Sequence, residues 1–385
     1  MLRLSALRYR DYKLSMKPRY LFIDDEVGKP THALLDGFND TGLISIDPLS
    51  IVKNETFDSI NAKLQSEYAK KGFDGILIDL CLDGTGANSL KFKAPPIAQQ
   101  VRTLASEKKL SHLPIVLCST IENEILFRND SSSHDLFDYY FNKSDLEFRK
   151  EAQRLRSLAE GYQVLNKKDV AIEDILGRTD FDALDSKLLD FMRGNMMSSF
   201  DIAQRIIKDM FRYSGLLITE RIMAARLGID IEESSETWEK LRDNVLVHAE
   251  YKGAFSSGWN RYWADKLNAI YMEFSGGVPY QIMTAAERIC TFTKSGFDGL
   301  VAAAPIPYNQ STYYNTVCVC YKRPLDAVEG IPVEDSMNLK PWQENRYVSF
   351  LAVAKGEFKE DCIGAAGKKR IEEIKQRIQD EQAKG

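Results

Sequence analysis

Short apolar runs alternate with amphipathic stretches along the first 160 residues of the chain. The apolar runs, typical of buried strands, are YLFI from Tyr20, FDGILIDL from Phe73, LPIVLCST from Leu113 and DYYFN from Asp138. Between them apolar residues recur at helical spacing, at Phe57, Ile60, Leu64 and Tyr68 and again at Ile97, Val101 and Leu104. This alternation predicts an α/β fold in which helices cover a doubly wound parallel sheet.

Polar side chains collect where these apolar runs end. Asp24 and Asp25 follow the first run, Asp79 and Ser119 lie near the ends of the next two, and Lys143 follows the last. Because the carboxyl ends of parallel strands meet at one edge of a sheet, we expect these side chains to converge. Three carboxylates together repel unless a cation is present, and their hard oxygens suit Mg²⁺. A lysine and a hydroxyl could hold the oxygens of a phosphoryl group that a carboxylate attacks.

In this order the residues resemble the receiver domain of two-component response regulators, over roughly residues 19–161. The resemblance implies a flavodoxin-like, five-stranded doubly wound sheet. It implies that Asp79 is the phosphoacceptor, with Lys143 and Ser119 as its catalytic partners. Ser119 and Tyr140 would act as the switch residues that respond to the new charge. The implied partner is a sensor histidine kinase or a phosphotransfer protein.

The resemblance also implies a Mg²⁺ cofactor. Asp25, Asp79 and the backbone carbonyl of Cys81 would hold the ion, with Asp24 acting largely through water. In the family the residues two positions after the phosphoaspartate and two after the hydroxyl residue tune hydrolysis, and here they are Cys81 and Ile121. Neither positions water well, so we expect a slowly hydrolysing acyl phosphate.

Several positions depart from the family pattern. Asp83, Thr120 and Ser144 replace a usual proline, alanine and proline, which affects loop geometry and leaves the charged and hydroxyl positions intact. The stretch 85–96 is longer than the usual loop, so we expect a lid or docking loop there.

The second half of the chain reads as α-rich and then α+β. Helical patterns cover 188–192, 202–210 and 218–227, and strand-like runs cover 300–305, 315–321 and 346–354. We predict five parts along the chain. A basic arm covers 1–18, the receiver domain 19–161 and a linker 162–180. An output or interaction region covers 181–365, and 366–385 form a helical tail that docks or forms a short coiled coil.

Two features of the second half suggest ligands. RIMAARLGID, which begins at Arg221, resembles the middle of a helix-turn-helix, but the acidic residues Glu232, Glu233 and Glu236 follow where phosphates would be met, so an ordinary helix ended by glycine is the preferred interpretation. The aromatic residues around Tyr251, Trp259 and Trp263 fit either a ligand pocket or, as aromatic stripes more often do, a core.

Composition narrows the function further. The 51 basic and 56 acidic residues give a net charge of −5, which disfavours nucleic acid as the main partner. The six cysteines form no CxxC pair, the four histidines have no metal-ligand spacing, and no apolar run is long enough to span a membrane. These observations favour a protein of the reducing cytoplasm without a zinc site.

The sequence leaves three functions open. The first is a phosphorylation-controlled regulator that signals through protein–protein interaction of its C-terminal region, as a monomer or a homodimer. The second is an enzyme of unfamiliar type gated by the receiver, although the sequence contains no catalytic pattern after Asp180. The third is a phosphate sink in a two-component cassette, for example an antiphage one.

Overall fold

The computed structural model describes residues 17–26, 29–84, 87–120, 135–193, 197–333, 339–359 and 362–382. The chain forms two compact units. The first consists of Met1–Phe181, Ser186–Ile207 and Lys252–Trp259, and the second of Asp182–Asp185, Lys208–Tyr251 and Asn260–Gly385. The first unit is therefore built from three separate stretches of sequence.

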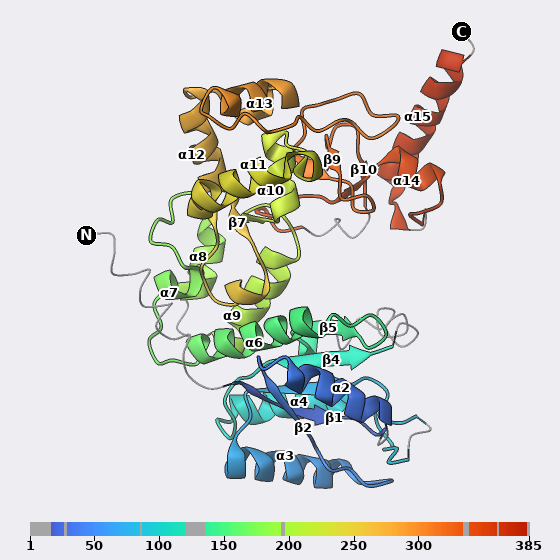
Figure 1. Ribbon diagram of the computed structural model, residues 1–385. Coiled ribbons are helices and arrows are strands. Elements are labelled where there is room, and N and C mark those ends of the chain that lie inside the picture. The colour runs from blue at the N-terminus through green and yellow to red at the C-terminus, as the bar shows by residue number, and fades with distance from the viewer. Residues whose placement is uncertain are drawn as a thin grey trace. The chain divides into compact units, whose positions relative to one another are not determined.

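A five-stranded parallel sheet forms the centre of the first unit (Figure 1). Its strands are β1 (Arg19–Ile23), β2 (Ser45–Pro48), β3 (Gly75–Asp79), β4 (Ile115–Ser119) and β5 (Tyr139–Asn142), in the order β2-β1-β3-β4-β5. This confirms the predicted parallel α/β sheet. In its register Ile23 lies opposite Ile78 and Ser119 opposite Asn142, so the residues that follow these strands share one edge of the sheet.

Helices cover both faces of this sheet. They are α2 (Lys29–Asp40), α3 (Phe57–Lys71), α4 (Ala94–Ser106) and α6 (Phe148–Leu165). Apolar residues of α3 and α4 join the core on one face. On the other face, where α2 contacts α6, the Phe38 ring lies 5.7 Å from that of Phe141 and 5.2 Å from that of Phe148. The predicted helical stripes are thus the core-facing sides of α3 and α4.

Local signals in the sequence explain where α3 begins and ends. The Thr56 hydroxyl accepts a hydrogen bond from the Ser59 amide at the first turn. Gly72 ends the helix with φ at 65°, a conformation in which a side chain would be strained.

Further short helices complete the first unit beyond the predicted range 19–161. They are α7 (Ile172–Leu176), α8 (Ser186–Arg193), α9 (Ser199–Gln204), the start of the π-helix η3 (Arg205–Phe211) and the 3₁₀ turn η5 (Ser256–Gly258). The stretch 162–180, expected to be a linker, contains the end of α6 and all of α7. Ile175 and Leu176 of α7 are buried, and the Ala254 amide donates to the Ile175 carbonyl at 2.8 Å, so this stretch packs into the first unit.

The second unit begins with helices around a core of large side chains. Its elements are β6 (Leu217–Ile218), α10 (Glu220–Leu227), α11 (Ile231–Asn244), η4 (Leu246–Ala249), β7 (Tyr262–Trp263), α12 (Ala264–Ser275), η6 (Tyr280–Ile282) and α13 (Ala285–Thr293). Trp238, Tyr271 and Phe292 are fully buried there. The predicted helix that stops at Gly228 is α10, and Gly228 adopts the left-handed conformation with φ at 75°.

Short strand pairs and two helices follow in the second unit. They are β8 (Thr316–Val317), β9 (Pro324–Leu325), β10 (Ile331–Pro332), β11 (Tyr347–Val348), α14 (Phe350–Ala354) and α15 (Ala365–Gln382). Ile371 and Ile374 of α15 are buried in this core, so the predicted tail helix docks on its own unit. None of the described helices is long and apolar enough to cross a membrane.

The expected strand 346–354 is wrong beyond its first residues. Only Tyr347 and Val348 form β11, and α14 follows at Phe350. Ser349 is the residue before that helix, with extended backbone, and its amide donates to the Cys318 thiol at 3.3 Å. The expected strand 300–305 contributes one isolated bridge at Ala302, and 315–321 contributes β8 and a bridge at Cys318.

Candidate functional site

The side chains at the carboxyl edge of the sheet converge on the ammonium group of Lys143. Lys143 Nζ lies 2.9 Å from Asp24 Oδ2 and 2.7 Å from Asp79 Oδ1. The Lys143 amide donates to the Ser119 carbonyl at 2.9 Å, which continues the ladder between β4 and β5 and fixes the lysine backbone. The ends of β1, β3, β4 and β5 therefore meet as the sequence predicts.

Asp25 is a buried carboxylate that lacks a full set of partners. Its exposed fraction is 2%, and its Oδ2 atom has no hydrogen-bond donor in the structure. Burial, together with the neighbouring Asp24 and Asp79 charges, raises the pKa of Asp25 from its ordinary value to about 6. A cation placed beside Oδ2 would offset both effects.

Asp79 is also buried and is held in one orientation. Its Oδ2 accepts a hydrogen bond from the Cys81 amide at 2.8 Å, while its Oδ1 contacts Lys143. Burial raises the pKa of Asp79 above its ordinary value, although Lys143 acts in the opposite direction. Burial alone would lower the pKa of Lys143, but the two carboxylates raise it, so this residue is a fixed positive charge.

The hydroxyl of Ser119 is fully buried, and no hydrogen-bond partner reaches its Oγ atom. It is therefore a free donor within the carboxyl edge. Tyr140 lies on the adjacent strand opposite Leu117 and packs, half-buried, against the core that α3 and α4 cover. The structure thus places both predicted switch residues on β4 and β5, which are neighbours.

The loop after β3 folds back onto β1. The Asn88 amide donates to the Asp25 carbonyl at 3.2 Å, and the Leu90 amide to the Leu82 carbonyl at 2.7 Å. Gly84 faces the site, because a Cβ atom there would lie 3.7 Å from the Cys81 carbonyl oxygen and 4.0 Å from Asp25 Oδ2. A small space bounded by a carboxylate and a carbonyl oxygen results.

The donor oxygens fit a hydrated divalent cation. No group of three or more His, Cys, Asp or Glu side chains in the described part of the chain could hold a metal ion by itself. The oxygens that border the space beside Gly84 belong to Asp25 and Cys81, and Asp79 is adjacent. Such a set suits Mg²⁺, which retains several waters and needs few protein ligands.

The predicted aromatic residues have separate structural roles. Tyr251 and Trp263 are 1% and 0% exposed, and their rings pack 5.5 Å apart in the core of the second unit. Trp259 belongs to the first unit, where its ring meets that of Tyr139 at 5.6 Å. Ile121, predicted to tune hydrolysis, lies outside the described residues.

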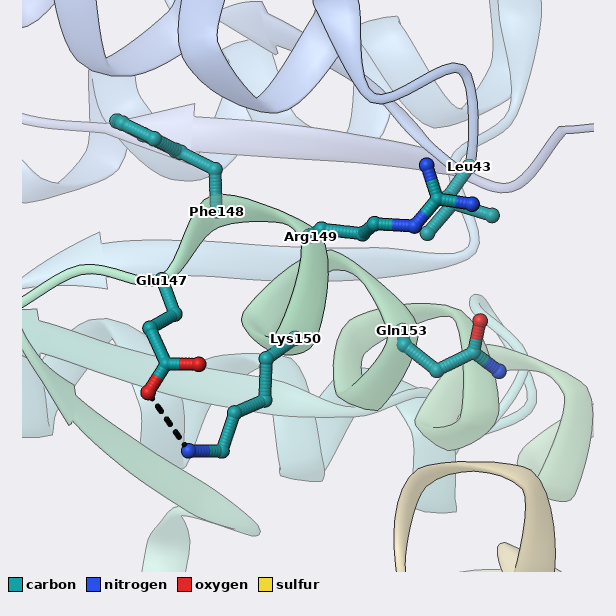
Figure 2. Close-up of a pocket in the computed structure, with 6 residues that line it drawn as sticks. All are labelled: Leu43, Glu147, Phe148, Arg149, Lys150 and Gln153. Carbon is teal, nitrogen blue, oxygen red and sulfur yellow. Dashed lines mark hydrogen bonds and ion pairs between the residues drawn. The ribbon is translucent and has the colours of Figure 1, made fainter.

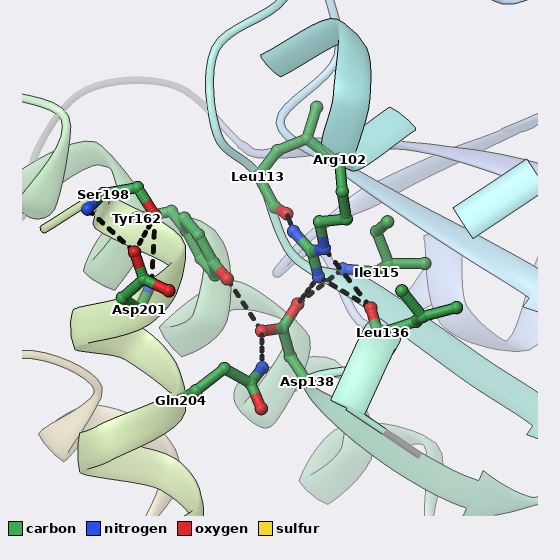
Figure 3. A network of polar contacts seen from close by, with 9 residues as sticks. All are labelled: Arg102, Leu113, Ile115, Leu136, Asp138, Tyr162, Ser198, Asp201 and Gln204. Carbon is green, nitrogen blue, oxygen red and sulfur yellow. Dashed lines mark hydrogen bonds and ion pairs between the residues drawn. The ribbon is translucent and has the colours of Figure 1, made fainter. Parts of the chain in front are cut away.

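A buried polar network at the opposite end of β5 was not foreseen from the sequence (Figure 3). Asp138, immediately before β5, accepts hydrogen bonds from Arg102, Tyr162 and Gln204, at 2.7, 2.7 and 2.8 Å. The signal that could have revealed it is Arg102 itself, because a charged residue on the apolar face of α4 requires a buried partner.

An open pocket lies at the N-terminal end of α6 (Figure 2). It is lined by Leu43, Glu147, Phe148, Arg149, Lys150 and Gln153. Lys150 pairs with Glu147 at 2.9 Å, and both side chains are more than half exposed. This pocket contains none of the sequence-predicted site residues, and its charges are partly neutralised within it.

Comparison with known proteins adds no assignment. No protein-family model matches the chain, and no curated protein matches it. The chemistry of the carboxyl edge is therefore the basis for a functional proposal.

The raised pKa of Asp25 leads to a stability prediction. Unfolded Asp25 ionises near pH 4 and folded Asp25 near pH 6, so stability falls as pH rises through this window. Asp25→Asn removes the repulsion and should raise the free energy of unfolding by about 1–2 kcal/mol at pH 7.5 without Mg²⁺. Denaturant titrations at pH 4.5 and 7.5 measure this, with exposed Asp83→Asn as control. Equal stability of Asp25→Asn and wild type at pH 7.5 would contradict it.

Proposed function

We propose that this protein is a response regulator in which Asp79 accepts a phosphoryl group from a histidine kinase or a phosphotransfer protein. One observation carries the proposal: the Lys143 ammonium forms ion pairs with the carboxylates of both Asp24 and Asp79 at the carboxyl edge of a parallel sheet. A carboxylate nucleophile beside a fixed cation is the arrangement that acyl-phosphate formation requires.

The transfer replaces one bond to phosphorus with another. An Asp79 carboxylate oxygen forms a bond to the phosphorus, while the bond from phosphorus to the donor's histidine nitrogen breaks, and that nitrogen regains a proton from solvent. Negative charge builds on the phosphoryl oxygens as this happens. Lys143 stabilises that charge, and the unpartnered Ser119 hydroxyl donates a hydrogen bond to one of these oxygens.

Mg²⁺ is part of this proposal, held by Asp25, Asp79 and the Cys81 carbonyl with Asp24 acting through water. When bound, the ion supplies positive charge that offsets repulsion between the carboxylates and the incoming phosphoryl group. The unpartnered Asp25 Oδ2 and the space beside Gly84 support this assignment.

The signal would leave the site through the two switch residues. An Asp79 phosphoryl group adds charge within reach of Ser119, and Tyr140 lies on the neighbouring strand. The output is interaction of the C-terminal region with a partner protein. Cys81 favours slow hydrolysis of the acyl phosphate. Burial raises the pKa of its thiol, so this position offers no base to activate water.

Phosphorylation of single variants tests the proposal. Wild type incubated with Mg²⁺ and acetyl phosphate should gain one base-labile phosphoryl group, seen by intact-protein mass spectrometry, and Asp79→Asn should gain none. Asp83→Asn is the matched control, because it removes an exposed carboxylate in the same loop. Labelling of Asp79→Asn, or no labelling of wild type by acetyl phosphate or phosphoramidate, would reject Asp79 as the acceptor.

A further inference from the structure

Two later segments of the chain cover the side of the first unit formed by β5 and α6. They are α9 (Ser199–Gln204) and the stretch Lys252–Trp259, which contains η5. We call these two segments together the β5 clamp. Both contact α6, and each also reaches a residue of β5 or the residue directly before it.

The Lys252–Trp259 segment contacts Tyr139, the first residue of β5, through one aromatic pair. The Trp259 ring meets the Tyr139 ring edge to face, with centroids 5.6 Å apart and planes at 84°. The Tyr139 hydroxyl donates to Glu151 at 2.8 Å and accepts from Arg154, both on α6. Tyr139 is therefore fixed by α6 and by the clamp at the same time.

Close packing along α6 holds the same segment in place. The Ser157 hydroxyl donates to the Phe255 carbonyl at 2.8 Å, and the Gln153 amide group donates to the Ser257 carbonyl at 3.0 Å. A Cβ atom on Gly161 would lie 2.1 Å from the Phe255 ring, so only glycine permits this approach. Phe255 itself adopts φ of 66°, an uncommon conformation that persists because its ring is buried here.

The α9 segment contacts Asp138, the residue directly before β5. Gln204 donates to Asp138 Oδ1 at 2.8 Å, beside the hydrogen bond from Tyr162 of α6 (Figure 3). On the same helix the Phe200 ring lies 4.0 Å from the Arg102 guanidinium. These contacts tie α9 to the buried carboxylate at the N-terminal end of the strand.

Strand β5 therefore has the candidate site at its carboxyl end and the clamp at its N-terminal end. Asn142 ends the strand, and Lys143, which contacts Asp79, follows directly. The clamp contacts Tyr139 and Asp138, which lie four and five residues before Lys143 along the same extended backbone. A shift of Lys143 toward a phosphoryl group on Asp79 would also displace Asp138 and Tyr139, because a strand transmits displacement along its length.

Chain connectivity joins the clamp to the second unit. The chain leaves the first unit after Ile207, re-enters it at Lys252 and leaves again after Trp259. Each clamp segment is thus linked through the backbone to residues of the second unit.

We propose that the β5 clamp is the device by which the state of Asp79 is conveyed to the second unit. This inference rests on the proposed function. Phosphorylation moves Lys143 and β5, the Tyr139–Trp259 and Asp138–Gln204 contacts rearrange, and the attached stretches 208–251 and 260–385 respond. In this proposal the receiver acts on segments of its own chain, the two clamp segments, and not on a separate output domain joined by a free linker.

Hydrogen exchange of the full chain tests this inference. Wild type is compared with and without Mg²⁺ and beryllofluoride, which mimics a phosphoryl group on an aspartate. We expect exchange to change by about threefold or more both in site peptides, residues 79–90, and in clamp peptides, residues 199–207 and 252–259. In Trp259→Leu the site peptides should still respond, while the response of residues 208–251 should be lost.

The outcomes separate the two proposals. If wild-type site peptides respond and clamp peptides do not, the clamp inference is overturned while the acceptor site stands. If no site peptide responds, the proposed function itself fails. Exposed Tyr313→Leu serves as the aromatic control in the second unit. If Trp259→Leu unfolds, Gln204→Leu replaces it, and a full wild-type response of residues 208–251 in that variant overturns transmission through the α9 contact.

Discussion

Asp138→Ala should lower the free energy of unfolding of the first unit by about 3–5 kcal/mol. The Asp138 carboxylate is fully buried and pairs with Arg102 at 2.7 Å. It also accepts hydrogen bonds from the Ile115 amide, the Tyr162 hydroxyl and the Gln204 amide group, at 2.8, 2.7 and 2.8 Å. Alanine leaves a buried guanidinium and three further donors without their acceptor, and each loss adds a desolvation cost.

Urea denaturation followed by far-UV circular dichroism measures this effect. The control is Glu107→Ala, which removes the partner of Lys109 from an ion pair whose side chains are both at least half exposed, and it should cost less than about 1 kcal/mol. A second variant, Arg102→Met, should also destabilise, because Asp138 then loses its only buried counter-charge in this network. A cost for Asp138→Ala as small as that of Glu107→Ala would show that the network adds little to stability.

Lys143→Met should lower the rate of phosphorylation by acetyl phosphate by about 10²- to 10³-fold. The Lys143 ammonium lies 2.7 Å from Oδ1 of the proposed acceptor carboxylate, so its charge is placed to stabilise the phosphoryl oxygens. Methionine keeps the length of the side chain and removes its charge. Loss of the lysine charge also removes the side-chain cation that pairs with Asp24 and Asp79.

The same variant makes a prediction about pH. Carboxylates whose pKa is raised in the folded state stabilise it at low pH and lose that contribution as pH rises through the raised pKa. Lys143→Met should therefore be less stable than wild type at pH 8, and this difference should shrink at pH 5. Added Mg²⁺ should restore stability at pH 8. Lys109→Met, at an exposed ion pair, is the control and should show none of these changes.

Rates of labelling and thermal melts at the two pH values measure these effects. Unchanged labelling of Lys143→Met would remove the lysine from the proposed chemistry. A melt at pH 8 that does not respond to Mg²⁺ would contradict the assignment of the metal to these carboxylates.

The sheet and its carboxyl edge could be predicted because their signals are local. A parallel strand buried on both faces is a short continuous apolar run, and its end is marked by the first charged residue, as at Asp24 and Asp79. The order of the strands then places Lys143 beside them, because the sheet leaves few alternatives. The contacts that Lys143 makes with both carboxylates agree with that reasoning.

The contacts of Asp138 and Tyr139 could not be predicted in this way. Their partners Gln204 and Trp259 are 66 and 120 residues further along the chain. No periodicity links positions so far apart, and Trp259 looked like one member of a local aromatic series. The position of Trp259 depends on packing between segments that are far apart in the sequence.

A second difference between prediction and structure lies where local preferences compete. The run RYVSFLAVA, from Arg346 to Ala354, is rich in residues that favour strands, yet its second half is α14. Ser349 at the turn marks the start of this helix, and serine in that position is a helix-start signal as well as a strand residue. Its amide bonds to Cys318, 31 residues earlier in the chain, which the sequence pattern does not report.

The clamp also sets an order of events during synthesis. A ribosome delivers β5 and α6 by residue 165, but the segment that covers Ser157 and Gly161 ends only at Trp259, 94 residues later. Until then the side of α6 that Phe255 covers, including Gly161 and Tyr162, lacks its partner, and incompletely buried surface of this kind attracts chaperones. Folding of the first unit therefore cannot be completed until residues 208–251 of the second unit, and then Lys252–Trp259, have been synthesised. A chain truncated before Lys252 should be prone to aggregation.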